Sequence, residues 1–426
     1  MFQALRKIWH NEFFKNVATL ISGTTLAQAV SVLIYIALSR IYSDEDFGVF
    51  GLYMNILNIT IIFATAKYEL AILLPKSERE SVNLLGLSGL ISTGVSLLLL
   101  LVVVFFNRQI CGYLGSEEIS SWLYYIPLST LLVGLFQSFR NYSNREKRYK
   151  LIAGANIAQS LGNSTLKVLL GLVVVGAAGL IYGVVFGQLV GVLIFLGVHF
   201  RTNSYKWGWL KISEMRRLAK EYSLFPRYNM WQGLVNNLSG ALPVFVFSSY
   251  FSLAAAGIYT FGYMLIYRPV NLVAGAFYQV LYQRFSEKIN TGQPFLSELK
   301  LFLRQAVLWL IIPFVVFGIF APDIFGFIFE KEEAGRYAQI MLPWIFMVSL
   351  TMPLSFIPDL YKKQSKALFL DSIRLVGRLA AMIVGVVMED LYLGLALYSG
   401  VSAITILYSL LWYIRLVKKN QSIENE

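Results

Sequence analysis

Four basic side chains lie inside long apolar stretches of the sequence, where charges are rare: Lys167, Arg268, Arg374 and Arg378. Arg268 lies about 14 residues from one end of the apolar segment 254–282, which is about 21 Å along a helix. At that depth in a bilayer an unpaired charge costs about 2.5–3.5 kcal/mol. Arg374 and Arg378 are four residues apart and therefore share one face of a helix. Cations kept at such a cost predict a site for an anionic ligand, and phosphate is an anion that arginine binds well.

Acidic partners for these cations are scarce in the same stretches. Apart from Asp371, near one end of its segment, no Asp or Glu lies well inside an apolar segment of the sequence. Lys167 has an alternative interpretation, because a lysine side chain can extend its ammonium group toward the membrane surface. The arginines could also bind neighbouring backbone carbonyls. Four cations with at most one internal carboxylate nevertheless favour a water-filled cavity in which the positive charge can meet an anion.

Neutral polar side chains follow the helical period in the first apolar segment and again about half a chain later. The first row is Thr24, Gln28, Ser31 and Tyr35, and 208 residues further on come Gln232, Asn236, Ser239 and Pro243. Asn55 and Asn58 lie in the second apolar segment, and Asn271 lies on the face of Arg268. Such rows line a cavity that hydrogen-bonds sugar hydroxyls, or they bind neighbouring helices. Their repetition favours a shared cavity.

Two of the helices that carry these residues contain proline. Pro243 follows the second polar row, and Pro269 follows Arg268 directly. Proline removes a backbone donor and its ring crowds the preceding turn, so we expect both helices to bend there.

The elements that position the candidate residues are predicted from length and composition. The chain has 426 residues, of which 57% are hydrophobic and 14% charged, and its mean hydropathy is +0.62. Apolar runs of membrane-spanning length recur throughout, which predicts an all-α, polytopic membrane protein. We expect about twelve spans: 16–39, 47–66, 82–106, 121–139, 151–174, 179–200, 224–250, 254–282, 301–321, 337–357, 367–388 and 392–414.

The distribution of basic residues gives these spans an orientation. The formal net charge of +12 could suggest a nucleic-acid partner, but the Lys and Arg residues lie in short loops between spans. Both termini and the loops on their side hold 28 of them, whereas the opposite loops hold four. By the positive-inside rule both termini are cytoplasmic, and the partner of the basic residues is the lipid bilayer and not nucleic acid.

The two halves of the sequence resemble each other at a nearly constant shift. Besides the polar rows, Ser43, Gly48 and Phe50 align with Ser252, Gly257 and Tyr259 at a shift of 209 residues. Six crossings return the chain to the same side, so the halves are expected to be parallel repeats. We therefore predict two pseudo-symmetric six-helix lobes around a central cavity. The predicted domains are an N-terminal lobe 1–200, a cytoplasmic amphipathic linker 201–223 with Ile212, Met215 and Leu218 on one face, and a C-terminal lobe 224–426.

Several kinds of chemistry are disfavoured by the sequence. It has no GxxxxGK[ST] phosphate-binding loop, and with one cysteine, Cys111, and two histidines it shows no metal cluster, so no cofactor or metal is predicted. Asp44, Glu45 and Asp46 in an outer loop could be catalytic carboxylates. However, Ser43 and Asp46 have the spacing of a capping box, and acidic residues stabilise a helix N-terminus. We predict that the protein is not an enzyme.

Two further patterns concern packing and the membrane interface. Gly179, Gly183, Gly187 and Gly191 recur every four residues along one span, which predicts close approach of a neighbouring helix. Tyrosine is abundant, at 25 residues. Tyrosines at the ends of spans are interpreted first as interfacial anchors, and a minority as platforms for sugars.

The segments 39–50, SRIYSDEDFGVF, and 67–76, KYELAILLPK, resemble the opening of the polysaccharide transporter family. This family contains bacterial flippases for lipid-linked O-antigen and capsule repeat units, and it belongs to the superfamily of multidrug, oligosaccharidyl-lipid and polysaccharide flippases. The motifs lie in the first three predicted spans. They are specific for the family and not for the sugars carried.

The resemblance implies a fold, an activity and partners. It implies two six-helix lobes, a central cavity and alternating access in the inner membrane. The implied cargo is an undecaprenyl-diphosphate oligosaccharide, and the implied partners in polysaccharide biosynthesis are a polymerase and a chain-length regulator. Two alternatives remain open from the residues: a cation or drug antiporter of the same superfamily, and a membrane-embedded polymerase or glycosyltransferase. The antiporter would be expected to carry membrane-buried carboxylates, which are nearly absent.

Overall fold

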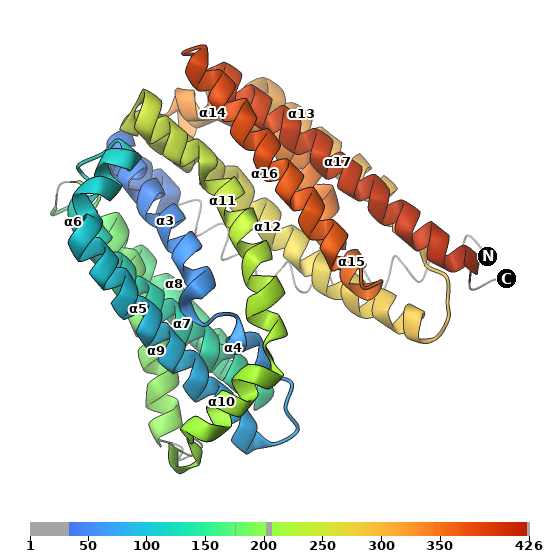
Figure 1. Cartoon of the computed structure of the whole chain (residues 1–426). Helices are drawn as coiled ribbons and strands as arrows, with labels where there is room; N and C mark the ends of the chain where they lie inside the picture. The colour runs from blue at the N-terminus through green and yellow to red at the C-terminus, as the bar shows by residue number, and fades with distance from the viewer. Residues whose placement is uncertain (1–33, 175, 202–206, 424–426) are drawn as a thin grey trace. The chain divides into compact units, whose positions relative to one another are not determined.

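The computed structural model describes residues 34–174, 176–201 and 207–423. The described residues form helices joined by loops (Figure 1). By their contacts they divide into two compact units: Ile41–Gly257 forms one, and Ile258–Glu426 with the residues up to Arg40 forms the other. The division predicted at residues 200 and 224 follows the sequence repeat and stays a prediction.

The unit Ile41–Gly257 is a bundle of long helices with short helical turns between them. Its core contains Leu84, Phe136, Phe195 and Leu218, which come from four different helices. The elements are α3 (Asp44–Ala64), α4 (Tyr68–Ala71), α5 (Glu78–Leu114), α6 (Ser120–Leu123), α7 (Tyr125–Arg145), α8 (Tyr149–Gly171), α9 (Ala178–Arg201), η2 (Trp207–Trp209), α10 (Ile212–Glu221), η3 (Phe225–Asn229), α11 (Met230–Val246) and η4 (Phe247–Phe251).

The start of α3 confirms the predicted capping box. The Ser43 hydroxyl accepts the Asp46 backbone N–H at 3.2 Å, and the Asp46 carboxylate accepts the Ser43 backbone N–H at 3.0 Å. Ser252, the repeat counterpart of Ser43, accepts the Ala255 backbone N–H at 3.0 Å before α12. Asp46 therefore satisfies backbone donors at a helix end, and the two halves of the chain begin corresponding helices in the same way.

The amphipathic segment between the predicted lobes forms α10 and packs on α5 (Figure 1). Met215 and Leu218 are buried as predicted, whereas Ile212 is 74% exposed because it occupies the first turn, beyond the contact with α5. Arg217 forms ion pairs with three carboxylates, including Glu80 of α5 at 2.5 Å. The hydrogen bonds to Glu80 and Glu214 raise the pKa of the Arg217 guanidinium. The linker is thus fixed to its neighbour by both apolar and polar contacts.

The second unit is built from longer helices. Its core includes Phe285, Phe295, Phe302 and Phe356, so aromatic rings from several helices meet there. Residues 34–41 are helical. The other elements are α12 (Leu253–Asn290, whose first turn belongs to the other unit), α13 (Leu296–Phe329), α14 (Glu332–Thr351), η5 (Met352–Leu354), α15 (Ile357–Leu360), α16 (Gln364–Val387) and α17 (Leu391–Ile423).

Each predicted span from 47–66 onward falls on helical residues, and most of span 16–39 lies outside the described residues. By length and composition alone, 7 of the described helical segments are apolar enough to cross a membrane. The helices that carry Lys167, Arg268 and the arginine pair, α8, α12 and α16, are not among these 7. The predicted site residues therefore lie on the less apolar helices, whereas helices such as α13 present an exposed apolar surface suited to lipid.

Candidate functional site

Arg268 lies near the middle of α12 and is exposed. Its guanidinium carbon lies 5.5 Å from the ring centroid of Tyr35, which is buried and packs edge-on against Phe261. In the part of the chain that the structure describes, no carboxylate forms an ion pair with Arg268. The charge is thus supported by an aromatic face and left open to a ligand.

Arg378 lies on α16 and is only 5% exposed. Its Nε donates a hydrogen bond to the Ser402 hydroxyl at 2.7 Å. Its guanidinium carbon lies 4.6 Å from the ring centroid of Tyr398 and 5.0 Å from that of Trp344. Three protein groups from α14 and α17 therefore hold this cation in place.

Arg374 lies one turn before Arg378 and is also engaged by protein groups. It forms an ion pair with Asp371 at 3.1 Å and donates a hydrogen bond to the Ser409 hydroxyl at 3.5 Å. Its Nε is buried with no hydrogen-bond partner in the described structure. Both arginines of the pair thus contact serines of α17, as expected for side chains on one face of α16.

Lys167 lies in the other unit, on α8, and is 6% exposed. Its ammonium nitrogen lies 4.5 Å from the ring centroid of Phe50, and its backbone carbonyl accepts a hydrogen bond from Tyr42 at 2.7 Å. The ammonium group therefore lies among side chains of α3, and the alternative in which it reaches the membrane surface is not what the structure shows.

The neutral polar residues differ in exposure. Asn236 and Asn271 are exposed, Asn58 and Gln232 are half-buried, and Ser239 is buried. Asn55 is half-buried, and its amide donates to the Gly51 carbonyl at 2.8 Å within its own helix. Thr24, Gln28 and Ser31 lie outside the described residues, so of that row only Tyr35 is placed, beneath Arg268.

The two prolines lie within helices. Pro243 is buried in α11, which passes into the π-helical turn η4 immediately after it. Pro269 lies inside α12, which continues through it from Leu253 to Asn290. The predicted bends at both prolines stay predictions.

Sequence reasoning missed the aromatic cluster that surrounds Arg378. Tyr259, Tyr263 and Tyr267 recur every four residues on α12, and their rings stack at 5.8 and 4.7 Å between centroids. Trp344 stacks on Tyr263 at 5.8 Å and packs edge-on against Tyr398 at 5.5 Å. The signal in the sequence was the four-residue spacing of the tyrosines. The partner rings come from distant segments, and no local pattern could identify them.

Buried carboxylates also occur, and they have cationic partners. Glu298, 7% exposed, accepts from Arg284 at 2.9 Å and from Lys288 at 2.6 Å. Glu69, 3% exposed, lies 3.9 Å from the Lys67 ammonium group and is hydrogen-bonded by Thr65. These acids are neutralised within their own unit, in contrast to Arg268.

The fold defines a class of membrane protein. Solved structures with a similar fold include a multidrug-resistance MATE family transporter of the MOP superfamily in an inward-facing conformation, with a TM-score of 0.66, 14% identity, and coverage of 91% of this chain and 96% of that chain. They also include the lipid II flippase MurJ in an inward closed conformation, with a TM-score of 0.72, 14% identity, and coverage of 95% and 91%. The predicted all-α polytopic membrane fold, with about twelve helices in two lobes, is confirmed by this likeness.

The family follows from the sequence. A search of curated proteins gave no match. The pattern of the family described as polysaccharide biosynthesis protein matches residues 37–331, and the chain belongs to that family. The predicted kinship with polysaccharide transporters is thereby confirmed.

Proposed function

We propose that this protein is a flippase that moves an undecaprenyl-diphosphate-linked oligosaccharide from the cytoplasmic to the outer leaflet of the bacterial inner membrane. The proposed mechanism is alternating access, with a cationic lumen that holds the diphosphate and polar side chains that hydrate the sugars. Both termini face the cytoplasm, and a polymerase and a chain-length regulator act on the exported O-antigen or capsule units. The family and the transporter fold support this proposal.

The observation that carries the proposal is the state of Arg268. It is a permanent cation near the middle of a long helix, it is exposed, and within the described structure it has no carboxylate partner. Burying an unpaired charge in lipid is costly, so the side chain must meet water or an anion. A diphosphate supplies several acceptor oxygens for the planar guanidinium fork.

Arg374 and Arg378 enter the proposal in a second role. Their present acceptors are mainly the neutral hydroxyls of Ser409 and Ser402. A phosphate oxygen is a stronger acceptor than a hydroxyl for a guanidinium group, so cargo could replace either serine. We assign first contact with the diphosphate to Arg268, and to the pair and Lys167 the positive potential that attracts it.

The two alternatives predict different site chemistry. A drug or cation antiporter needs carboxylates free to bind a cation, whereas the buried Glu69 and Glu298 already contact basic residues. A polymerase or glycosyltransferase needs catalytic acids, and Asp46 is engaged in capping α3. The cationic residues fit an anionic cargo better than either alternative.

The test is export of lipid-linked oligosaccharide in cells that carry Arg268→Ala or Arg268→Lys. We expect Arg268→Ala to reduce export at least about tenfold, because a charge-assisted contact contributes about 1.5–3 kcal/mol. Arg268→Lys keeps the charge and loses the fork, so its export is expected to be intermediate.

The matched control is Arg415→Ala, which removes one exposed arginine near the end of α17. Its export is expected to equal that of the unmodified protein at equal membrane abundance. Full export by Arg268→Ala would remove this residue from the mechanism and the proposal with it.

A further inference from the structure

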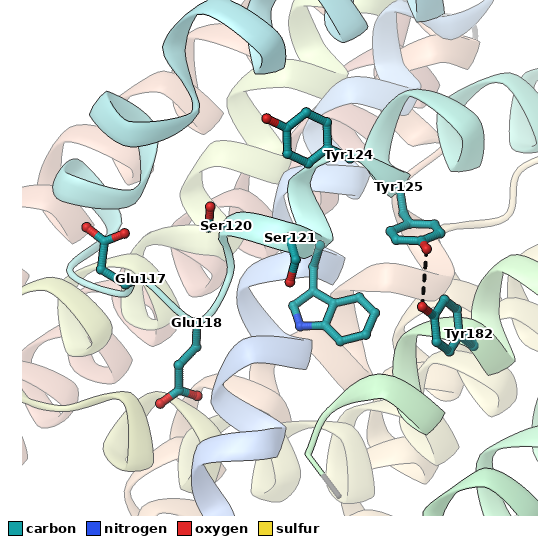
Figure 2. Close-up of a pocket in the computed structure, with 8 residues that line it drawn as sticks. Glu117, Glu118, Ser120, Ser121, Tyr124, Tyr125 and Tyr182 are labelled. Carbon is teal, nitrogen blue, oxygen red and sulfur yellow. Dashed lines mark hydrogen bonds between the residues drawn. The ribbon is translucent and has the colours of Figure 1, made fainter. Parts of the chain in front are cut away.

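An open pocket of about 720 Å³ lies in the unit Ile41–Gly257, where the chain between α5 and α7 meets the start of α9 (Figure 2). Exposed carboxylates of Glu117 and Glu118 line one part of it, and the rings of Trp122, Tyr125 and Tyr182 line another. Serine hydroxyls lie between them in Figure 2. These residues lie on the side predicted to be opposite to the cytoplasm, because both the α5–α7 connection and the start of α9 are outer segments in the predicted orientation.

The aromatic wall of the pocket is held by its own contacts. Tyr182 packs edge-on against Trp122 at 5.3 Å and against Tyr125 at 5.4 Å between ring centroids. The hydroxyls of Tyr125 and Tyr182 are hydrogen-bonded at 3.1 Å, as Figure 2 shows. Edge-to-face packing of this kind is favourable beyond simple burial. The rings are therefore positioned before any ligand arrives.

The acidic side of the pocket is also fixed in place. The Ser120 hydroxyl donates to the Asn107 side-chain oxygen at 2.6 Å, and the Asn107 amide donates back to the Ser120 carbonyl at 2.8 Å. These two bonds tie the segment that carries Glu117 and Glu118 to α5. A preorganised site loses less entropy when a ligand binds.

Interfacial anchoring of aromatic rings does not account for this arrangement. An anchor is a ring that faces the headgroups by itself, as Tyr113 does with 86% exposure at the end of α5. In the pocket, three rings pack on one another around a concave surface that also carries two carboxylates. Such a combination of aromatic walls and a few polar groups is typical of a small-molecule site.

We propose that this pocket binds a saccharide on the outer side of the membrane. The inference rests on the proposed function for its orientation and for the presence of glycans there. The rings offer apolar faces to the C–H groups of a sugar, and serine, tyrosine and carboxylate oxygens accept or donate hydrogen bonds to its hydroxyls. The described lining residues include two carboxylates and neither Lys nor Arg. The pocket therefore selects neutral or amino sugars and disfavours uronic acids, whose carboxylates it repels.

The test is binding of the full chain in lipid nanodiscs to an array of lipid-free oligosaccharides that contains neutral, N-acetylated, amino and uronic members. We expect binding to neutral or amino members, weakened at least about tenfold by Trp122→Ala. Tyr182→Phe keeps the ring packing and removes one hydroxyl, so it is expected to weaken binding about threefold to tenfold without loss of folding. Tyr113→Ala, outside the pocket, is the matched control and should bind normally.

Charge selection has its own test. A double change of Glu117→Gln and Glu118→Gln removes the negative charge at two exposed positions, and we expect it to strengthen binding of uronic members several-fold. Equal binding of uronic and neutral sugars by the unmodified chain would overturn the proposed selectivity.

The outcomes separate this inference from the proposed function. No binding to any array member, or full binding by Trp122→Ala and Tyr182→Phe, would overturn the pocket even if export depends on Arg268. Binding that persists while Arg268→Ala exports normally would leave the saccharide site standing and remove the flippase mechanism. Binding of tetramethylammonium in place of sugars would identify a cation site and overturn the saccharide assignment.

Discussion

Arg268 and Arg378 show how the surroundings of a charged side chain decide its role. Both guanidinium groups lie near an aromatic ring in the same unit. Arg378 is 5% exposed and is also hydrogen-bonded to Ser402, whereas Arg268 is exposed with no ion pair among the described residues. A buried cation with satisfied contacts contributes to structure, and an exposed one on a membrane helix is available to a ligand.

The structural role of Arg378 is testable by a conservative change. Arg378→Lys keeps one positive charge but loses the Nε bond to Ser402 and the planar contact with Trp344 and Tyr398. We expect the free energy of unfolding to fall by about 1–3 kcal/mol, because each lost interaction contributes about 0.5–2 kcal/mol. The measurement is the thermal midpoint of the purified protein in detergent, with Arg415→Lys as the exposed control. An unchanged midpoint with lost export would show instead that Arg378 contacts the cargo.

The sequence could indicate the positions of these arginines but not their environments. Apolar length and the rarity of intramembrane charge were enough to select Arg268, Arg374 and Arg378. The rings and hydroxyls that hold Arg378 come from α14 and α17, and their approach depends on the packing of helices distant in sequence. The same limit applies to the outer pocket, because Tyr182 joins Trp122 and Tyr125 only after α9 packs on α7.

Among the helices, α8 and α9 show a packing device that was visible in the sequence. Four glycines recur on α9, and a Cβ added to Gly187 would lie 2.6 Å from the Gln159 carbonyl oxygen of α8. A Cβ on Gly183 would lie 2.8 Å from the Asn163 carbonyl oxygen. The predicted close approach of a neighbouring helix is confirmed, since backbone atoms of α8 occupy the space of the missing side chains.

Gly187→Ala tests this packing against a control on the same helix. We expect it to lower the free energy of unfolding by about 1–3 kcal/mol, because the Gln159 carbonyl cannot move without displacing α8. Gly197→Ala, with nothing within 4 Å of its added Cβ, should be neutral or stabilise by up to about 1 kcal/mol through helix propensity. Thermal unfolding of both variants in detergent measures the difference. Equal midpoints would show that the two helices separate easily at this position.

Other elements show where periodicity succeeds and where it stops. Helices were predictable because apolar runs of span length leave few alternatives, and the capping box at Ser43 was visible from residue types alone. Exposure along α10 was less predictable: a three-residue spacing placed Ile212 with Met215 and Leu218, yet only the latter two reach α5. Sequence period gives the face of a helix, and the extent of its neighbour determines how much of that face is buried.

For the whole molecule, the charge distribution ties orientation to transport. The basic loops place both termini in the cytoplasm, and the proposed cargo is an anion that moves outward. With the cytoplasm negative, outward movement of one full negative charge is favoured by about 2.3 kcal/mol per 100 mV. The same potential draws an empty cationic lumen back toward the cytoplasm. The proposed cycle therefore needs no ion gradient as an energy source.

This reasoning predicts that export responds to membrane potential. In proteoliposomes that contain the full chain and a lipid-diphosphate oligosaccharide, a potential negative on the side of the termini should accelerate transfer away from that side. Abolishing the potential should slow it at least about tenfold for each charge moved across 100 mV, and Arg268→Ala should reduce this dependence because its empty site returns with one positive charge fewer. The measurement is transfer at clamped potassium diffusion potentials, with sodium and proton gradients set to zero. Transfer that ignores the potential and requires a sodium or proton gradient would contradict the mechanism, because the fixed positive charges would then have no part in driving the cargo outward.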